Sequence, residues 1–93
     1  MVETFLYRNG SEKSLQEMLE GYGGKRVQVD ITIGYTPGRY VAYEFRSGGF
    51  VLIEGDEGAE CSTVVLAGFP QTGFTYRTIK REFEKSGARP LKA

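Results

Sequence analysis

The sequence predicts a mainly β fold in which a short N-terminal helix precedes a small five-stranded barrel. The first observation is the segment from Lys25 to Gly34, where apolar and polar residues alternate strictly, as in a half-buried strand. The second is an amphipathic helical pattern before this segment, and the third is a series of short apolar runs separated by glycine turns. The apolar positions of the alternating segment are all β-branched and are expected to face the core: Val27, Val29, Ile31 and Ile33.

The composition indicates one folded domain. We expect this domain to span residues 1–86 and to be followed by a mobile tail over residues 87–93. A hydrophobic content of 40%, with six Tyr and six Phe, is sufficient for a single core and argues against intrinsic disorder. The 12 basic residues balance the 12 acidic ones, so no overall positive field attracts nucleic acid or an anionic membrane.

The chain has no histidine and one cysteine, Cys61, so it cannot assemble a structural zinc site and lacks the commonest general base. No nucleophile and base stand at a spacing with a known mechanism, and we expect no enzyme activity, no catalytic residues, no metal and no cofactor. A single cysteine, no secretory pattern and no membrane-length apolar run predict a cytoplasmic protein without a membrane partner.

The N-terminal third should contain a strand and a helix. Val2 to Arg8 has a β-favouring composition and precedes a turn at Asn9-Gly10. Ser11 and Ser14 both suit the N-cap of the helix that follows, and Gly21 suits the position after its end. The helix should bury one apolar stripe, formed by Leu15, Met18, Leu19 and Tyr22.

The glycines from Gly21 to Gly24 precede two cations and could be read as a phosphate-binding loop. Such loops run from a strand through the glycines into a helix, whereas here the helix comes first. We therefore interpret the glycines as a helix stop and a turn.

Two further strands should form a hairpin after the alternating segment. Pro37-Gly38 suits the centre of a type II turn, and Arg39 to Arg46 reads as the next strand. Ser47-Gly48-Gly49 then forms a tight turn into the strand Phe50 to Glu54. If Ser47 and Gly48 are the turn residues, Phe45 faces Phe50, and the consecutive apolar residues that follow Phe50 indicate cover on both faces.

A fourth strand is expected over Thr63 to Ala67, after an acidic loop from Gly55 to Glu60 that we interpret as solvated. This strand carries no charge or proline that would block pairing along its edge. We therefore expect a homo-oligomer that assembles through strand edges.

The segment from Phe74 to Lys85 has two interpretations. The preferred one is a strand over Phe74 to Ile79, followed by a short helix or an irregular turn. The alternative is a helix capped by Gly87, with Tyr76, Ile79 and Phe83 on one face.

Four segments together carry a family resemblance, and they lie between Ser11 and Ile79. They are the helix Leu15 to Leu19 and the glycine-led strand entries Gly24 to Val29, Gly38 to Val41 and Gly49 to Ile53. Their order resembles the SH3-type small barrels, in particular the Sm-like family of RNA-binding ring proteins, and implies edge-to-edge assembly. The family's nucleotide pocket uses Asp and Asn, then a basic-Gly pair, where this chain has Arg46 to Gly49 and Gln71 to Gly73.

The predicted function is that of a non-enzymatic binding or assembly module that acts through protein–protein contacts, as a homo-oligomer or with another protein. The alternative is an RNA- or DNA-binding protein. Aromatic and cationic side chains around one end of the sheet would then stack on bases and neutralise phosphates of a single strand. The candidate nucleic-acid-binding residues are Lys25, Arg26, Tyr35, Arg39 and Tyr40.

Overall fold

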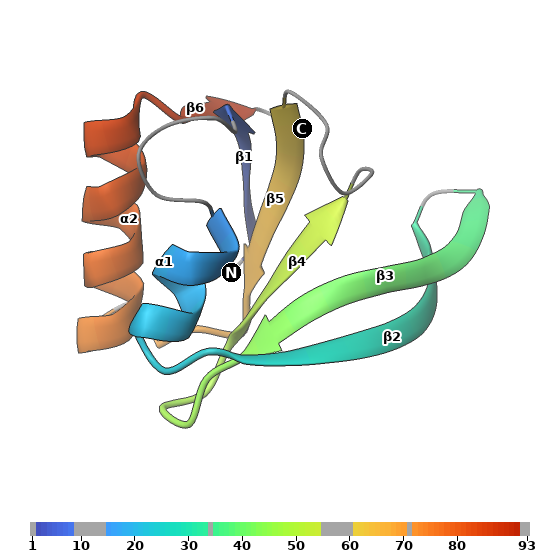
Figure 1. Ribbon diagram of the computed structural model, residues 1–93, viewed down its shortest axis with the longest axis horizontal. Coiled ribbons are helices and arrows are strands. Elements are labelled where there is room, and N and C mark those ends of the chain that lie inside the picture. Colours follow the sequence, from blue (N-terminus) through green and yellow to red (C-terminus); the bar gives the residue numbers. More distant parts are fainter. Residues whose placement is uncertain (1, 9–14, 34, 55–60, 71, 92–93) are drawn as a thin grey trace.

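In the computed structural model, which describes residues 2–8, 15–33, 35–54, 61–70 and 72–91, six strands form one antiparallel sheet. Two helices lie side by side against one face of this sheet (Figure 1). The elements in chain order are β1 (Val2–Arg8), α1 (Leu15–Gly21), β2 (Lys25–Ile33), β3 (Thr36–Glu44), β4 (Phe50–Glu54), β5 (Cys61–Ala67), α2 (Phe74–Ser86) and β6 (Arg89–Leu91).

The strands follow the order β2-β3-β4-β5-β1-β6 across the sheet. The predicted mainly β fold with an N-terminal helix is therefore confirmed. In the part of the chain that the structure describes, β2 and β6 end the sheet and do not pair with each other, so the sheet is open and a five-stranded barrel is not confirmed. The first strand, β1, occupies the edge of β5, and the segment after β5 is a helix instead of a closing strand.

Helix α2 takes the place of the strand that was expected over Phe74 to Ile79, and that expectation is wrong. The alternative interpretation holds, because Tyr76, Ile79 and Phe83 recur at helical spacing and are all buried. Gly87 ends the helix with a φ of 79°, and its N–H bonds to the carbonyl of Glu84. Tertiary burial here overrides the local β preference of Phe, Thr and Tyr.

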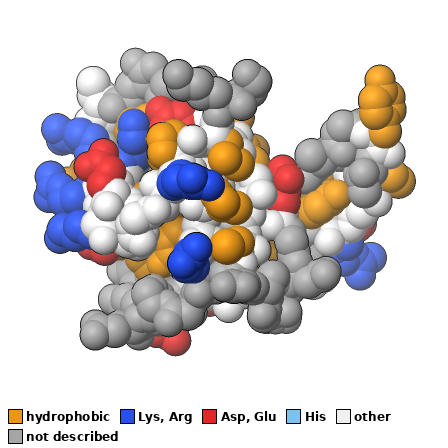
Figure 2. Space-filling model, turned by 90° about the horizontal axis from the view of Figure 1, so that it is seen from above, with side chains coloured by type: hydrophobic (Ala, Val, Ile, Leu, Met, Phe, Trp, Pro, Cys, Tyr) orange, Lys and Arg blue, Asp and Glu red, His pale blue; other side chains and the backbone are white. Residues whose placement is uncertain are grey.

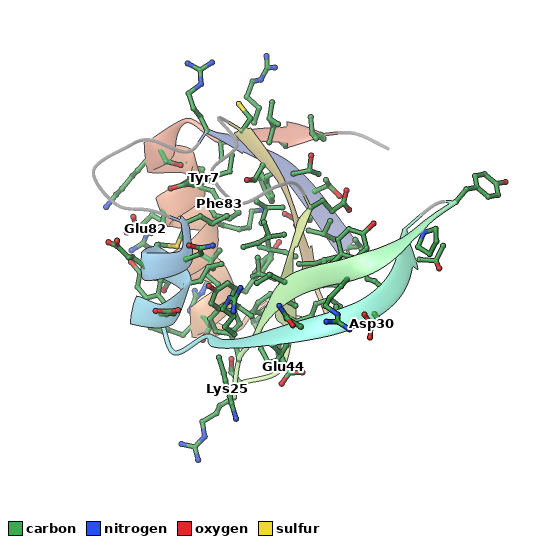
Figure 3. The ribbon with its side chains drawn as sticks, turned by 45° about the vertical axis from the view of Figure 1, so that its right-hand side comes forward. Tyr7, Lys25, Asp30, Glu44, Glu82 and Phe83 are labelled. Carbon is green, nitrogen blue, oxygen red and sulfur yellow. The ribbon has the colours of Figure 1, made fainter. Side chains whose placement is uncertain are left out.

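The core lies between the two helices and the middle of the sheet. The ring of Phe83 in α2 is fully buried, with its centroid 5.2 Å from that of Phe5 and 5.5 Å from that of Tyr7, both in β1. Figure 3 shows Tyr7 and Phe83 together between α2 and the sheet. Helix α1 contributes the apolar stripe predicted for it, formed by Leu15, Met18 and Leu19.

The end of α1 differs in detail from the prediction. Gly21 is still helical, and Gly23 is the first residue with a positive φ, at 91°. Tyr22 is 37% exposed and lies outside the core, and its hydroxyl donates a hydrogen bond of 2.9 Å to Glu82 of α2. This bond connects the two helices at their solvent side.

Val27, Val29 and Ile31 of β2 do not face the core, which corrects the prediction made for them. Val27 and Val29 are half-buried and Ile31 is 39% exposed, while the side chain of Ile33 lies outside the described residues. The prediction failed because β2 is an edge strand of a hairpin that extends beyond both helices (Figure 1). A period of two identifies a strand with two unlike faces and does not say which layer covers either face.

Both predicted hairpin turns change position or register. Ile33 pairs with Thr36, so the β2–β3 connection lies at residues 34–35, and Pro37 belongs to β3. Gly48 and Gly49 have φ values of 97° and 92°, which confirms the second turn.

The register of that second hairpin is one residue away from the prediction. Phe50 lies opposite Glu44 instead of Phe45. The reason is the length of the turn, because the N–H of Phe45 bonds to the carbonyl of Gly49 and leaves three residues between them.

Part of the expected C-terminal tail belongs to the sheet. Residues Arg89–Leu91 form β6, which pairs with β1 and places Pro90 opposite Phe5. The turn at Asn9-Gly10, the caps at Ser11 and Ser14 and the loop from Gly55 to Glu60 lie outside the described residues.

Replacing Phe83 with Ala should destabilise the protein by about 3–5 kcal/mol, because it leaves a cavity between α2 and β1. The matched control is Phe74→Ala in the same helix, where the side chain is 76% exposed and the expected change is within about 0.5 kcal/mol. Urea unfolding followed by circular dichroism measures both. Equal midpoints for the two variants would contradict the packing described here.

Gly49→Ala should destabilise the protein more than Gly48→Ala. Both substitutions place a side chain at positive φ, which costs about 1 kcal/mol. A Cβ on Gly49 would also lie 2.5 Å from the Phe69 ring, whereas one on Gly48 would lie 3.9 Å from its nearest neighbour, Pro70. We expect about 1–3 kcal/mol of additional loss for Gly49→Ala. Thermal melts of the two variants compare them, and a lower melting temperature for Gly48→Ala would refute the contact.

Candidate functional site

The β2–β3 hairpin is the part of the sheet that the helices leave uncovered. Its two strands pair over nine residues each, from Lys25 opposite Glu44 to Ile33 opposite Thr36. Figure 1 shows the hairpin curving away from the helices. The exposed side chains on β2 include Arg26, whose charge is available to a binding partner.

The two faces of the hairpin differ in chemistry. On the side of the helices β2 carries Arg26, Gln28 and Asp30, which are exposed. On the opposite side it carries Val27 and Val29, which are half-buried.

The helix-free face of the sheet has an apolar row of its own, formed where neighbouring strands place Ala42, Leu52 and Val65 side by side. Ala42 and Leu52 are 3% and 6% exposed, although they lie outside the main core cluster. Other apolar side chains of this face reach the solvent, at 39% exposure for Ile31 and 41% for Phe50. Figure 2 shows hydrophobic side chains exposed in the middle of the molecule and on the projecting hairpin.

Among the residues that the structure describes, no strand pairs with the outer edge of β2. The positions of the backbone groups that point to this edge follow from a hydrogen bond at the next hairpin. The N–H of Phe45 bonds to the carbonyl of Gly49, on the side of β4. Successive residues of a strand direct their main-chain groups to opposite sides. The even-numbered residues of β3 therefore form their main-chain hydrogen bonds with β2. Their partners in β2 are the odd-numbered residues, such as Val27 and Val29. Arg26, Gln28 and Asp30 therefore turn their N–H and C=O groups toward the open edge.

The edge that the sequence suggested for assembly is not free. β5 pairs with β4 on one side and with β1 on the other, so the apolar run from Thr63 to Ala67 is internal. A continuous apolar strand without charges is typical of the middle of a sheet, where both of its edges are paired. β6, at the far end, has three residues, and its Pro90 lacks an N–H, which blunts that edge. β2 is the long edge of the described sheet.

The five residues proposed for nucleic-acid binding lie on the hairpin but do not share one surface. Arg26 and Arg39 project on the helix side, while Lys25 and Tyr40 project on the other side. Figure 3 shows Lys25 at the base of the hairpin, pointing away from the body of the molecule. Tyr35 is fully exposed at the tip. The hairpin brings these residues onto one element without forming a single stacking platform, and their role in binding stays a prediction.

Arg39 already has an acidic partner. Its Nε lies 3.1 Å from Oδ1 of Asp30, directly across the hairpin, and both side chains are largely exposed. An exposed pair of this kind contributes about 0.2–1 kcal/mol. It reduces the positive charge that Arg39 offers to a phosphate.

A second polar cluster joins α2 to β1. The hydroxyl of Tyr76 donates a hydrogen bond to Oε1 of Glu3, and the Nζ of Lys80 lies 3.3 Å from Oε2 of the same carboxylate. The Nζ of Lys80 also lies 5.3 Å from the centre of the Tyr76 ring. The cluster borders a surface hollow whose lining includes Val2 and Leu91. Both carboxylate oxygens are in use, so the cluster fixes the helix on the sheet.

The same cluster sets a pH dependence. Burial, followed by the hydrogen bond to Glu3, raises the pKa of Tyr76 above 10.0. Burial alone would lower the pKa of Lys80, but hydrogen bonds to Tyr76 and Glu3 raise it above 10.5. Both groups therefore hold their protons more tightly in the folded state than in the unfolded state.

Comparison with family models, with curated proteins and with solved structures finds no match for this chain. Among the residues that the structure describes, no helix is long and apolar enough to cross a membrane. Within the same residues, no three His, Cys, Asp or Glu side chains lie close enough together to hold a metal ion.

Sequence reasoning did not identify the free edge of β2. The alternation of Gln28, Asp30 and Thr32 indicated one exposed face of this strand. No sequence signal marks an edge, because edge status depends on which strands pair with it.

The contribution of Tyr76 and Lys80 to the free energy of unfolding should be constant from neutral pH to about 10. At higher pH this contribution should decrease. Their folded-state pKa values are raised, so the stabilisation is complete below the unfolded values of 10.0 and 10.5 and is lost above them. Tyr76→Phe should reduce the decrease in stability between pH 10 and 11, because it removes one of the two titrating groups. Urea midpoints between pH 8 and 11 test it, with Tyr35→Phe at the exposed hairpin tip as the control. Identical slopes for Tyr76→Phe and the unmodified chain would refute the linkage.

Proposed function

We propose that this chain is a non-enzymatic binding module that acts through protein–protein contacts, and that the open edge of β2 is its contact surface. The observation that carries the proposal is the nine-residue strand at the end of the sheet, with alternate backbone groups turned outward. An extended segment of another polypeptide can pair with such an edge through main-chain hydrogen bonds.

The partly exposed apolar residues beside the edge support the same function. Val27, Val29 and Ile31 lie on one face of β2, next to the apolar row of the sheet. A strand added to β2 would place its own alternate side chains against these residues. Main-chain bonds would then provide affinity, and the apolar contacts would provide selectivity.

Nucleic-acid binding ranks second. Its candidate residues are divided between the two faces and the tip of the hairpin, and Arg39 is neutralised in part by Asp30. The chain has no net charge to strengthen phosphate binding.

Gln28→Pro should abolish protein binding while the fold is retained. The N–H of Gln28 points to the open edge, so proline removes an outward donor and no bond within the sheet. Immobilised protein is incubated with a lysate of its source cells, and bound proteins are quantified by mass spectrometry. The control is Arg81→Ala on the exposed surface of α2.

Proteins captured by the unmodified chain and by Arg81→Ala, but at least about tenfold depleted with Gln28→Pro, would support the proposal. Capture that is unaffected by Gln28→Pro, or no capture at all, would contradict it. Fluorescence anisotropy with labelled oligouridine tests the alternative, which predicts salt-sensitive binding that is weakened by Lys25→Glu. Circular dichroism verifies that each variant is folded.

A further inference from the structure

The sequence of β2 is complementary to itself when two copies run antiparallel. The residues of β2 that direct their main-chain groups toward the open edge include Arg26, Gln28 and Asp30. Their side chains are a cation, an amide and an anion, placed at equal intervals. Rotation by 180° about Gln28 exchanges the cation with the anion. An interface related by a twofold axis requires this kind of self-complementarity.

We infer that β2 pairs with β2 of a second copy of this chain, antiparallel, with the two Gln28 residues opposite each other on the twofold axis. The inference rests on the proposed function and names its partner. In this register Arg26 lies opposite Asp30 of the second copy, and the symmetry repeats the pair. The same register places Val27 opposite Val29 of the second copy, also twice.

The backbone permits this register. In an antiparallel sheet, two residues that lie directly opposite each other can exchange two main-chain hydrogen bonds. They do so only if both residues direct their N–H and C=O groups toward the shared edge. Arg26, Gln28 and Asp30 all do so, as the bonding pattern of β3 establishes. Each copy thus pairs the outward residues of β2 with outward residues of the other.

Other registers of the same strand lack the charge match. An axis at Arg26 or at Asp30 places like charges opposite each other, which is unfavourable in a sheet. An axis at Val27 or at Val29 leaves Arg26 and Asp30 opposite uncharged residues. The axis at Gln28 is the one position between Arg26 and Asp30 that pairs opposite charges.

The carboxylate of Asp30 is accessible to a second cation. Oδ1 accepts a hydrogen bond from Arg39 of the same chain at 3.1 Å, and the Asp30 side chain is 75% exposed. Figure 3 shows Asp30 on the projecting hairpin, away from the helices. Arg26 of the second copy would bind the same exposed carboxylate, so that it is shared by two guanidinium groups.

Near the twofold axis, the helix-free face of this interface would be apolar, and farther out Lys25 of each copy would lie opposite Ile31 of the other. Val27 and Val29 are half-buried in one copy and would contact their counterparts across the axis. The apolar row of the helix-free face would then continue from one sheet into the next. The result is one twelve-stranded sheet with the two helix pairs at its outer parts, consistent with the six strands of each copy.

The first experiment measures mass by size-exclusion chromatography with light scattering, from about 5 µM to about 500 µM protein. The unmodified chain should approach twice 10.4 kDa as the concentration rises. Arg26→Asp alone and Asp30→Lys alone should each weaken the dimer at least about tenfold, because each places like charges opposite each other twice. Arg81→Asp on α2 should leave the dimer unchanged.

Mixing the two single variants is the sharpest test. In a mixed dimer the aspartate introduced into one copy faces the lysine introduced into the other, and the native Arg26 faces the native Asp30, so both pairs are attractive. An equimolar mixture of R26D and D30K should therefore recover the dimer that neither variant forms alone. Circular dichroism confirms that each variant is folded before mixing.

A crosslink reports the register directly. In a Cys61→Ser background, Gln28→Cys should form an intermolecular disulfide on mild oxidation, because residues opposite each other in a sheet lie within disulfide reach. Thr32→Cys in the same background should not, since this register places the two residues far from the axis. A crosslink with Thr32→Cys and none with Gln28→Cys would overturn the register.

A mass of 10.4 kDa at every concentration, or a mixture that stays monomeric, would overturn the inference. These outcomes are distinguishable from failure of the proposed function. A monomer whose protein capture is still lost with Gln28→Pro binds a different protein at the same edge. A monomer whose capture is indifferent to Gln28→Pro refutes both.

Discussion

The packing of α2 against β1 determines how the rest of the molecule is arranged. Phe83 is fully buried against the rings of Phe5 and Tyr7, and Ile79 is fully buried in the same helix. This contact joins two ends of the chain that are more than seventy residues apart in sequence. It keeps the N-terminal strand inside the sheet, where β5 and β6 pair with its two edges.

Two short helices cannot cover six strands. A helix of 13 residues is about 20 Å long, whereas six strands at about 4.8 Å spacing extend over a wider sheet. The helices cover the central strands, and the β2–β3 hairpin at one end stays outside this cover (Figure 1). The exposure of the hairpin is therefore a consequence of where α2 packs, and the proposed binding function depends on it.

The two edges of the described sheet differ in how open they are to pairing with a further strand. β6 is three residues long and contains Pro90, features that limit pairing with another strand. β2 is nine residues long and carries a cation and an anion, Arg26 and Asp30, among the residues that direct their main-chain groups toward this edge. Charge placement on an edge favours selected partners over general aggregation, since like charges directly opposite each other are unfavourable.

The sequence by itself determined most of the elements, because local patterns set them: five strands, the helix stripe Leu15 to Leu19 and the turn at Gly48 and Gly49 are all present. Only the tertiary structure decided the conformation of Phe74–Ser86, where β-favouring residues form a helix because their helical spacing buries Phe83. It also decided which face of β2 is covered and which strand edges are free. Both depend on contacts between residues distant in sequence, which no periodicity of two or of 3.6 encodes.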